Sequence, residues 1–201
     1  MGFYAFMKKL LAGLIRKLWR VRIVGAENER EGVPYLICAN HQSLFDVIIL
    51  GASIKHNPKY MAKKELMKVP FIGMLIRALG AFPVDRKGSD VAAIKKTINL
   101  LKDGESVTLF PQGTRHKGVS PVGTPVKHGC AMIALRADVA VLPVFIKVKD
   151  YKVRLFRRTT LVIGKEITPD EMRSVMTSNE DYKSAAEHIF SEITKLEDVQ
   201  K

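Results

Sequence analysis

Residues 34–46 read PYLICANHQSLFD, a short apolar run followed directly by polar residues and an acid. The apolar run predicts a buried strand. Ser43 and Asp46 have the spacing of a helix capping box, so a helix is predicted to begin there. On one continuous helix, residues five apart point about 140° away from each other. His41 and Asp46 can therefore meet only if the histidine lies in the loop and the acid in the first turn of the helix.

A histidine held by a carboxylate can act as a general base that deprotonates a hydroxyl group. The pair also has a plainer interpretation, in which Asp46 only caps the helix and His41 only fills the loop. These residues alone leave both interpretations open, so the choice between them depends on the rest of the chain.

Strands and helices are predicted to alternate along the chain. Apolar runs that end at glycine, proline or polar residues predict strands at residues 21–24, 34–39, 59–62, 81–84, 106–110, 139–148 (interrupted by Pro143) and 153–163. Periodicity and capping residues predict helices from Asp46 to about residue 54, on either side of Pro70 within 63–79, between Ser89 and Gly104, at 127–136, from Thr168 and at 179–197. This order predicts one α/β domain over residues 21–201, with a largely parallel central sheet flanked by helices.

Residues 1–20 are predicted to form a separate amphipathic helix. Apolar residues recur at helical spacing on one face: Phe3, Met7, Leu10, Leu14 and Leu18. Much of the rest of the helix is basic, with Lys8, Lys9, Arg16 and Arg20, and Trp19 lies near its end. This pattern is typical of a helix that lies on an anionic membrane surface. An ordinary helix docked on the domain is the alternative. No run reaches the roughly 18 apolar residues of a membrane span, so the predicted association is peripheral.

The chain carries a net charge of +13, although residues 165–201 contribute five Lys or Arg against nine Asp or Glu. The positive charge therefore comes from the preceding residues and favours an anionic partner: nucleic acid, acidic lipid, a phosphate substrate or an acidic carrier protein. Aromatic residues make up only 7% and no recognition motif is present, which argues against nucleic acid. Cys38 and Cys130 fit neither a disulfide framework nor a metal site, so both are predicted to be buried thiols in a reducing compartment.

Polar residues follow three of the predicted strands at the points where the strands end. The three loops carry His41 and Asp46, then Asp85 and Arg86, then Gln112, Gly113, Thr114 and Arg115. The carboxyl ends of parallel strands lie along one edge of a sheet, where ligands bind. Arginine suits a phosphate group, and glycine lets the backbone approach a ligand closely. The combination predicts a hydroxyl activated by His41 on a substrate whose phosphate is held by arginines.

Each of these residues also has an ordinary explanation. Either arginine could be a surface charge, Gly113 could belong to a plain turn, and Lys63 could be a solvated residue at a helix start. Motifs of competing chemistries are missing, because the sequence has no G-x-S-x-G, G-x-G-x-x-G, H-E-x-x-H or Walker motif. A serine nucleophile, a dinucleotide, zinc and a nucleotide are therefore disfavoured.

Four ordered segments resemble the motifs of the glycerolipid acyltransferases, most closely those of the bacterial 1-acyl-sn-glycerol-3-phosphate acyltransferases. They are Asn40-His41-x4-Asp46, Phe82-Pro83-Val84-Asp85-Arg86, Phe110-Pro111-Gln112-Gly113-Thr114-Arg115 and Val141-Leu142-Pro143-Val144. The resemblance extends from about Arg22 to Gly164 and includes Ala62-Lys63-x-Glu65-Leu66. The first motif alone is weak evidence, but four motifs in the order and spacing of the family are highly specific.

The resemblance implies a fold like that of glycerol-3-phosphate acyltransferase and a reaction in phospholipid synthesis. His41 would be the general base that removes the proton from the sn-2 hydroxyl of lysophosphatidate, and Asp46 would orient it. The hydroxyl would attack an acyl thioester of coenzyme A or acyl-carrier protein and give phosphatidate, without a covalent acyl-enzyme. The implied phosphate-binding residues are Gly113, Thr114, Arg115, Arg86 and Lys63, with Pro143 near the acyl donor. No metal or bound cofactor is implied, and the implied location is the cytoplasmic face of the membrane.

Gln112 departs from the family, which usually has glutamate at this position. Glutamine keeps the size and a carbonyl acceptor, but it loses the charge and gains donors. An obligatory acid or base role is therefore disfavoured, whereas a hydrogen bond to the substrate or to a neighbouring arginine stays open. The acceptor could instead be glycerol-3-phosphate or another lysophospholipid. A non-catalytic protein of the same fold that binds anionic lipid is the alternative from a different class.

Overall fold

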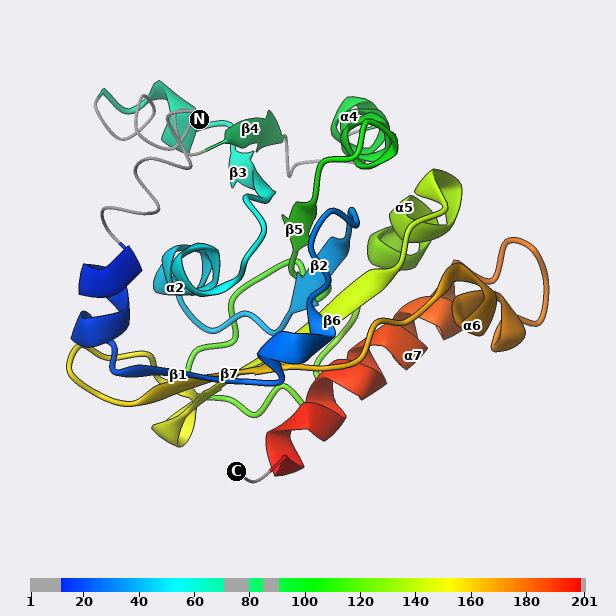
Figure 1. Cartoon of the computed structure of the whole chain (residues 1–201). Helices are drawn as coiled ribbons and strands as arrows, with labels where there is room; N and C mark the ends of the chain where they lie inside the picture. The colour runs from blue at the N-terminus through cyan, green and yellow to red at the C-terminus, as the bar shows by residue number, and fades with distance from the viewer. Residues whose placement is uncertain (1–11, 71–79, 85–90, 200–201) are drawn as a thin grey trace.

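The computed structural model describes residues 12–70, 80–84 and 91–199. Its centre is a seven-stranded sheet with the order β1-β7-β6-β2-β5-β3-β4, and helices lie on both faces (Figure 1). Neighbouring strands are parallel except for β6 and β7, which are antiparallel. The prediction of an α/β fold with a largely parallel sheet is confirmed.

The elements follow the predicted alternation. The strands are β1 (Val21–Val24), β2 (Leu36–Ala39), β3 (Lys59–Lys63), β4 (Ala81–Val84), β5 (Val107–Leu109), β6 (Val141–Val148) and β7 (Thr159–Ile163). The α-helices include α2 (Phe45–Ser53), α4 (Val91–Lys102), α5 (Gly129–Ala137), α6 (Pro169–Ser174) and α7 (Tyr182–Lys195), and residues 12–18 are also helical. Short 3-10 helices are η1 (Ala26–Asn28), η2 (Leu66–Lys68), η3 (Lys149–Tyr151) and η4 (Leu196–Asp198).

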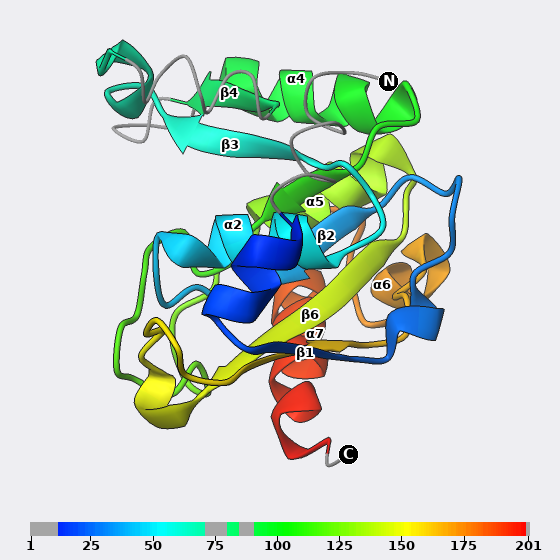
Figure 2. The same ribbon diagram turned by 60° about the vertical axis from the view of Figure 1, so that its left-hand side comes forward.

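Each face of the sheet buries its own apolar core. On one face α4, α5 and α7 enclose side chains such as Leu101, Ile133 and Ile189. On the other face α2 and the segment after the first helix contribute Ile49 and Trp19. Figure 2 shows α2 and the helix at residues 12–18 together on this second face. A strand that is covered on both faces must be apolar throughout, as β2 is.

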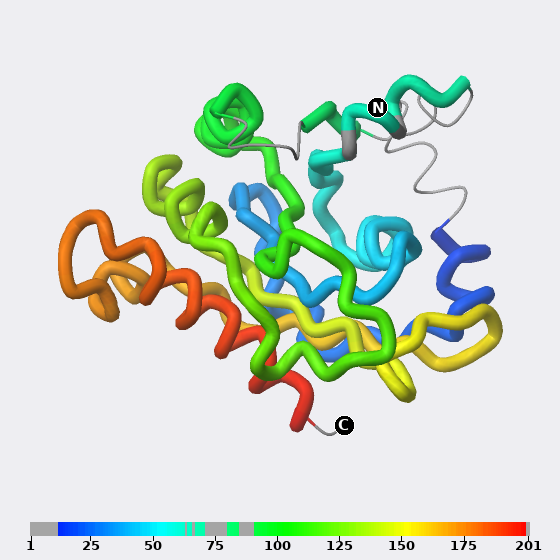
Figure 3. The backbone as a smooth tube through the Cα atoms, turned by 180° about the vertical axis from the view of Figure 1, so that it is seen from behind, coloured from blue at the N-terminus to red at the C-terminus, as the bar shows by residue number. Residues whose placement is uncertain are grey.

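The carboxyl ends of β2 and β5 lie next to each other because these strands pair in parallel. The loops that follow them, with His41 and Gln112, are therefore neighbours, as predicted. The long connection from β5 to α5, green in Figure 3, runs across the sheet on the near side of that view. β4 lies at the edge of the sheet and is separated from β5 by β3. Asp85 and Arg86, which follow β4, lie outside the described residues.

Strand β6 differs from its prediction, because Pro143 does not interrupt it. The proline lies one residue before antiparallel pairing with β7 begins at Val144 and Ile163. It pairs with Cys38 of β2 in register, and its carbonyl accepts the N–H of Gly164 at 2.9 Å. Proline has no N–H group to donate. Because Pro143 precedes the first antiparallel pair with β7, strand β6 continues through it.

The predicted strand at residues 153–163 is wrong for its first six residues. Strand β7 begins at Thr159, and the residues before it form an exposed connection with a turn. Apolar and β-branched residues in this segment resemble a strand pattern, but Leu155 and Phe156 are 50% and 68% exposed. No core covers these side chains, so the pattern does not reflect a buried sheet face.

The chain around Pro70 is only partly described. The helix predicted before this proline is replaced by the end of β3 and the short η2. The helix predicted after it falls on residues 71–79, which lie outside the described residues. The same is true of Ser89, the predicted cap of α4.

The predicted N-terminal helix is described from residue 12 and continues to residue 18. Residues 1–11, with much of the predicted apolar face, lie outside the described range. In the described part, Arg16 Nε donates to the carbonyl of Ala52 at 3.0 Å. The ring of Trp19 lies 5.1 Å from that of Phe45, so this end of the segment docks on α2. Membrane association of residues 1–20 stays a prediction.

Candidate active site

His41 and Asp46 meet at the carboxyl end of β2. His41 lies in the loop after the strand, and Asp46 is the second residue of α2. Nδ1 of the imidazole is 2.9 Å from Oδ2 of the carboxylate. His41 is 7% exposed and Asp46 is fully buried. The contact predicted from the five-residue spacing is therefore present.

The start of α2 holds the carboxylate of Asp46 in place. Its Oδ2 accepts the backbone N–H groups of Gln42 and Ser43 at 2.6 and 2.7 Å. The predicted capping box is only half present, because the N-cap of α2 is Leu44 and Ser43 accepts the N–H of Phe45. The carboxylate binds the N–H groups of the two residues before the N-cap, so it fixes the loop that leads into α2, while the serine hydroxyl accepts the N–H of the first helical residue.

These hydrogen bonds decide which nitrogen of His41 can act. The ionised carboxylate of Asp46 can only accept hydrogen bonds, so in its contact with the imidazole the hydrogen lies on Nδ1 of His41. Nε2 then carries the lone pair, and within the described ranges no hydrogen bond engages it. The ring of Phe110 stacks on the imidazole with a centroid distance of 4.0 Å and an interplanar angle of 17°. The imidazole is thus oriented at one edge and one face, and it can accept a proton at Nε2.

Gln112 holds the backbone of His41. Its Oε1 accepts the N–H of His41 at 2.7 Å, and its Nε2 donates to Oγ1 of Thr124 at 2.8 Å. The threonine hydroxyl donates in turn to the carbonyl of Pro121. Gln112 is 3% exposed, so its carboxamide is engaged with the protein at both ends. This arrangement favours positioning of the histidine loop over contact with a substrate.

Gly113, which follows Gln112 in this loop, leaves room for the side chain of Lys127. Gly113 has a φ of +68°, and a Cβ atom there would lie 2.7 Å from Cε of Lys127. Glycine is needed both for this backbone conformation and for the close approach. The N–H of Lys127 donates to the carbonyl of Pro111 at 2.9 Å, which ties the lysine to the loop. Its ammonium group forms no ion pair with the described residues, so it is available to an anion.

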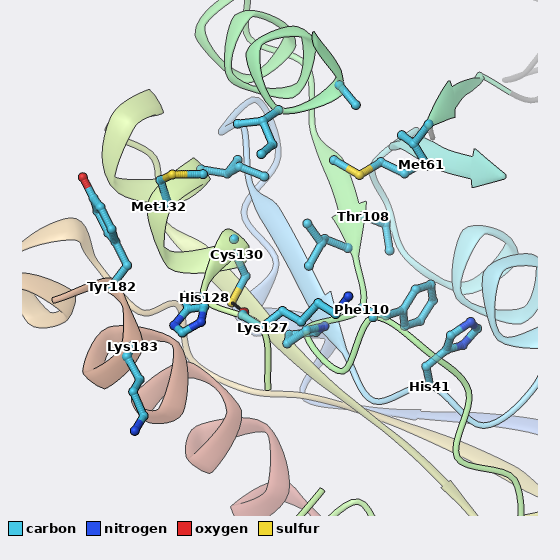
Figure 4. A pocket seen from close by; sticks show the side chains of 18 of the residues that line it. His41, Met61, Thr108, Phe110, Lys127, His128, Cys130, Met132, Tyr182 and Lys183 are labelled. Carbon is cyan, nitrogen blue, oxygen red and sulfur yellow. Dashed lines mark hydrogen bonds between the residues drawn. The ribbon is translucent and has the colours of Figure 1, made fainter. Parts of the chain in front are cut away.

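A cavity of about 1050 Å³ opens beside His41. It lies between β3, β5, α4, α5 and the start of α7, and most of its walls are apolar, including Met61, Val84, Ile94, Leu109, Met132 and Ile133. Figure 4 shows His41 and Phe110 on one side of this space, and Tyr182 and Lys183 on the other. Lys127 lies between them and extends toward Phe110. The cavity is therefore suited to an amphipathic molecule with an anionic group.

The far end of the cavity carries charges of both signs. Lys183 and Glu180 line it together with Asp181, the N-cap of α7. Hydrogen bonds from Ser184 and Thr177 hold the pKa of Asp181 well below its usual range. Because this end is acidic as well as basic, an anionic group is better accommodated near Lys127, on the side of His41.

The two cysteines are free and buried, as predicted. Burial raises the pKa of the Cys38 thiol well above its ordinary value, and the neighbouring Cys130 adds to the shift. Cys130 lines the cavity, with Sγ 3.5 Å from the carbonyl of Lys127. A buried thiol is a poor nucleophile, so His41 is the better candidate for the reactive group. Across the part of the chain that the structure describes, no group of three or more His, Cys, Asp and Glu could hold a metal ion.

The structure does not bring all the predicted residues to the cavity. Gly113 lines it, but Thr114 and Arg115 are exposed and do not. Lys63 is the last residue of β3, and neither its side chain nor Arg86 is among what the structure describes. Sequence reasoning missed Lys127, for which the only signal was its position at the start of a predicted helix.

Comparison with known proteins gives a consistent result. The model of the Acyltransferase family matches residues 20–147. The 1-acyl-sn-glycerol-3-phosphate acyltransferase of Bacillus subtilis (strain 168) is 30% identical over 197 residues, which cover 96% of each chain. The protein of the same name from Streptococcus pneumoniae is 30% identical over 99% of this chain and 75% of its own. The crystal structure of the 1-acyl-sn-glycerophosphate (LPA) acyltransferase PlsC from Thermotoga maritima aligns with a TM-score of 0.69 and 28% identity, over 98% of this chain and 84% of that one.

The matched range contains the residues that build the site. His41, Asp46, Gln112 and Gly113 all lie within residues 20–147, which are more than half of the chain. The fold shared with the Thermotoga maritima structure is the mostly parallel α/β fold described above. The resemblance predicted from four sequence motifs is therefore confirmed, and the chain belongs to the Acyltransferase family.

Proposed function

We propose that the chain transfers an acyl group from an acyl thioester to the sn-2 hydroxyl of 1-acyl-sn-glycerol-3-phosphate, giving phosphatidate. The observation that carries this proposal is the buried His41–Asp46 pair at one side of an apolar cavity. The names of the relatives that match nearly the whole chain support the choice of acceptor.

His41 acts as a general base in the proposed reaction. Its Nε2 takes the proton of the acceptor hydroxyl while the hydroxyl oxygen attacks the thioester carbonyl. The new carbon–oxygen bond forms, the carbon–sulfur bond breaks, and the proton passes from the imidazolium to the leaving thiolate. Asp46 keeps the ring oriented and stabilises its charged form. The acyl group moves directly to the acceptor, so no acyl-enzyme forms.

The cavity accommodates the two unlike parts of the substrates. Its apolar walls, with Met61 and Met132 on opposite sides, suit an acyl chain. Lys127 offers an ammonium group for the phosphate beside the loop that holds His41. The family resemblance adds Lys63, Arg86, Thr114 and Arg115 as further phosphate contacts, to be tested by substitution.

The acceptor is a membrane lipid, so the proposed place of action is the cytoplasmic face of an anionic membrane. Residues 1–20 attach the protein peripherally, and residues 21–201 form the catalytic domain. The net charge of +13 supports attraction to anionic lipid. No described helix has the length and apolar character of a membrane span. The donor is a thioester of coenzyme A or acyl-carrier protein, and the reaction uses no metal or bound cofactor.

Transfer of labelled acyl groups to lysophosphatidate in vesicles tests the proposal. Acyl-coenzyme A and acyl-carrier protein are supplied separately, with wild type beside His41→Ala. We expect phosphatidate with at least one donor, and turnover lowered about 10²–10⁴-fold by the substitution. His188→Ala, a histidine on α7 paired with Glu171, is the matched control and should keep normal turnover.

Two outcomes would redirect the proposal. Turnover only with glycerol-3-phosphate or another lysophospholipid would change the acceptor and keep the chemistry. Vesicle binding without turnover on any acceptor, equal in wild type and His41→Ala, would make the chain a lipid-binding protein.

A further inference from the structure

Exposed apolar side chains gather on one side of the molecule. Of the twelve large apolar side chains that are exposed in the described part, six come from three segments: Leu14, then Leu44, Phe45 and Ile48, then Leu155 and Phe156. We call these six residues the apolar face. Their exposed fractions range from 42% for Ile48 to 68% for Phe156. A patch built from three segments is more informative than single exposed apolar residues, which are common on any protein surface.

Direct contacts tie the three segments to one another. Arg16 of the first helix donates to Ala52 of α2 at 3.0 Å. The N–H of Phe156 donates to the carbonyl of Leu18 at 2.7 Å, which ties the connection between β6 and β7 to the end of that helix. In Figure 1 the first helix (blue), α2 (cyan) and this connection (yellow) lie along the same side of the sheet.

The connection presents its apolar residues at the tip of a turn, residues 152–158, which we call the hairpin tip. The N–H of Arg157 bonds to the carbonyl of Arg154, so Leu155 and Phe156 are the two central residues. Phe156 has a φ of +61°, a conformation that a bulky side chain rarely adopts and that glycine adopts without strain. Glycine would adopt this backbone conformation at the lowest conformational energy, but the sequence has phenylalanine here, and its side chain is two-thirds exposed.

Cationic residues flank Leu155 and Phe156 in the sequence. Lys152, Arg154, Arg157 and Arg158 belong to the hairpin tip, and no acid occurs between residues 151 and 165. None of the four cationic side chains forms an ion pair within the described ranges. An apolar tip among unpaired cations fits an anionic lipid surface, where apolar groups enter the acyl region and cations contact the headgroups.

We propose that the hairpin tip inserts Leu155 and Phe156 into an anionic bilayer, with Leu44, Phe45 and Ile48 lying at the same surface. The inference rests on the proposed function, and it adds a second attachment element besides residues 1–20. Leu44 and Phe45 lie between His41 and Asp46 in the sequence, so the loop that holds the base also faces the lipid. Docking through this face brings the catalytic loop to the bilayer from which the acceptor comes.

Binding to vesicles of phosphatidylcholine with about one-third phosphatidylglycerol tests this inference. The variant is Leu155→Ser/Phe156→Gly in the full chain, because glycine relieves the positive φ and leaves the fold intact. We expect cosedimentation to weaken about tenfold or more. The matched control is Val175→Ser, which removes an exposed apolar residue beside α6 and should leave binding unchanged. In Phe156→Trp, added indole fluorescence should be quenched by brominated lipid.

Turnover on acceptor dispersed below its micelle concentration is measured for the same variants. It should be equal in all of them, which separates lipid docking from catalysis. Wild-type binding that persists unchanged in Leu155→Ser/Phe156→Gly would overturn the inference and leave the proposed function standing. Absence of wild-type binding would also overturn it, whereas absence of turnover would count against the proposed function. A dimer that the double substitution dissociates, with vesicle binding unchanged, would assign the face to a second copy of the chain.

Discussion

Two buried histidine–carboxylate pairs lie at opposite ends of α2. At the start of the helix, Nδ1 of His41 is 2.9 Å from Asp46. Beyond its end, Nδ1 of His56 is 2.7 Å from Oε1 of Glu29. The histidine side chains are 9% and 14% exposed and the acids 0% and 1%, so burial does not distinguish the pairs.

The second ring nitrogen does distinguish them. Nε2 of His56 is 2.8 Å from the carbonyl of Val33, so both of its nitrogens face acceptors. Glu29 also accepts the N–H groups of Lys55 and His56, which ties the chain after α2 to the segment before β2. His41 instead lines the cavity. A histidine and a carboxylate thus join two chain segments at one end of α2 and form a candidate base at the other. The difference lies in what surrounds Nε2 of the histidine.

The largest effect is expected when each of the two histidines is replaced by glutamine. His41→Gln removes the proton acceptor and should lower turnover about 10²–10⁴-fold, with little change in stability. His56→Gln should leave turnover essentially unchanged and lower the free energy of unfolding by about 1 kcal/mol. Steady-state kinetics and urea unfolding measure the two effects. A large loss of turnover in a stable His56→Gln protein would remove the distinction.

The carboxylates should differ in the same way. Asp46→Asn keeps an acceptor for the backbone N–H groups but loses the charge that stabilises the imidazolium, so kcat should fall by about a hundredfold with KM little changed. Glu29→Gln is the control and should keep kcat. An unchanged kcat in Asp46→Asn would restore the plainer interpretation, in which this acid only caps α2.

Glu29 should matter for stability in a pH-dependent way. Burial alone would raise its pKa, but hydrogen bonds from His56 and from the N–H groups of Lys55 and His56 outweigh burial and lower the pKa below 4.5. A carboxyl group with a lowered pKa stabilises the fold above its unfolded pKa, and this stabilisation is lost as the pH falls through the folded pKa. Glu29→Gln should lower the free energy of unfolding by about 1–3 kcal/mol at neutral pH and flatten its decline in acid. Urea unfolding across this range measures both; a decline parallel to that of wild type would contradict the assignment.

The smallest expected effect is that of Gln112→Glu. The substitution keeps the acceptor for the N–H of His41 but removes the donor to Thr124 and adds a buried charge. Turnover should fall a few-fold, and by the same factor for lysophosphatidate, glycerol-3-phosphate and other lysophospholipids, because Gln112 acts through His41. The same comparison tests a second hypothesis, that glutamine in place of the family's usual glutamate alters the preference for the acceptor. A changed profile would support that hypothesis and contradict a purely positioning role.

The sequence was sufficient for the order of elements and for the central pair. Alternating apolar runs and capping residues predict most strands and helices, because these signals are local. His41 and Asp46 were found because they are five residues apart and one follows a strand while the other begins a helix. Glu29 and His56 carry an equivalent contact, but 27 residues separate them and no periodic pattern links them.

Other features depend on tertiary packing. The hydrogen bond from Gln112 to His41 joins residues 71 apart, and it exists only because β2 and β5 are neighbours. Lys127 reaches the cavity because Gly113 leaves room for its side chain. The predicted strand at residues 153–163 is wrong for residues 153–158 because richness in β-branched residues satisfies the strand pattern whether or not a core covers the side chains.

The backbone of His41 is held on both sides by the connection between β5 and α5. Its N–H donates to Gln112, and its carbonyl accepts the N–H of His116 at 2.8 Å. Contacts of such long sequence separation form late in folding, because a large loop must close first. During synthesis the histidine emerges well before the residues that fix it, and it gains its geometry only when β5 has joined β2. The candidate base is therefore oriented only once the sheet has assembled, and a nascent chain that ends before β5 contains His41 without the hydrogen bonds that fix its backbone.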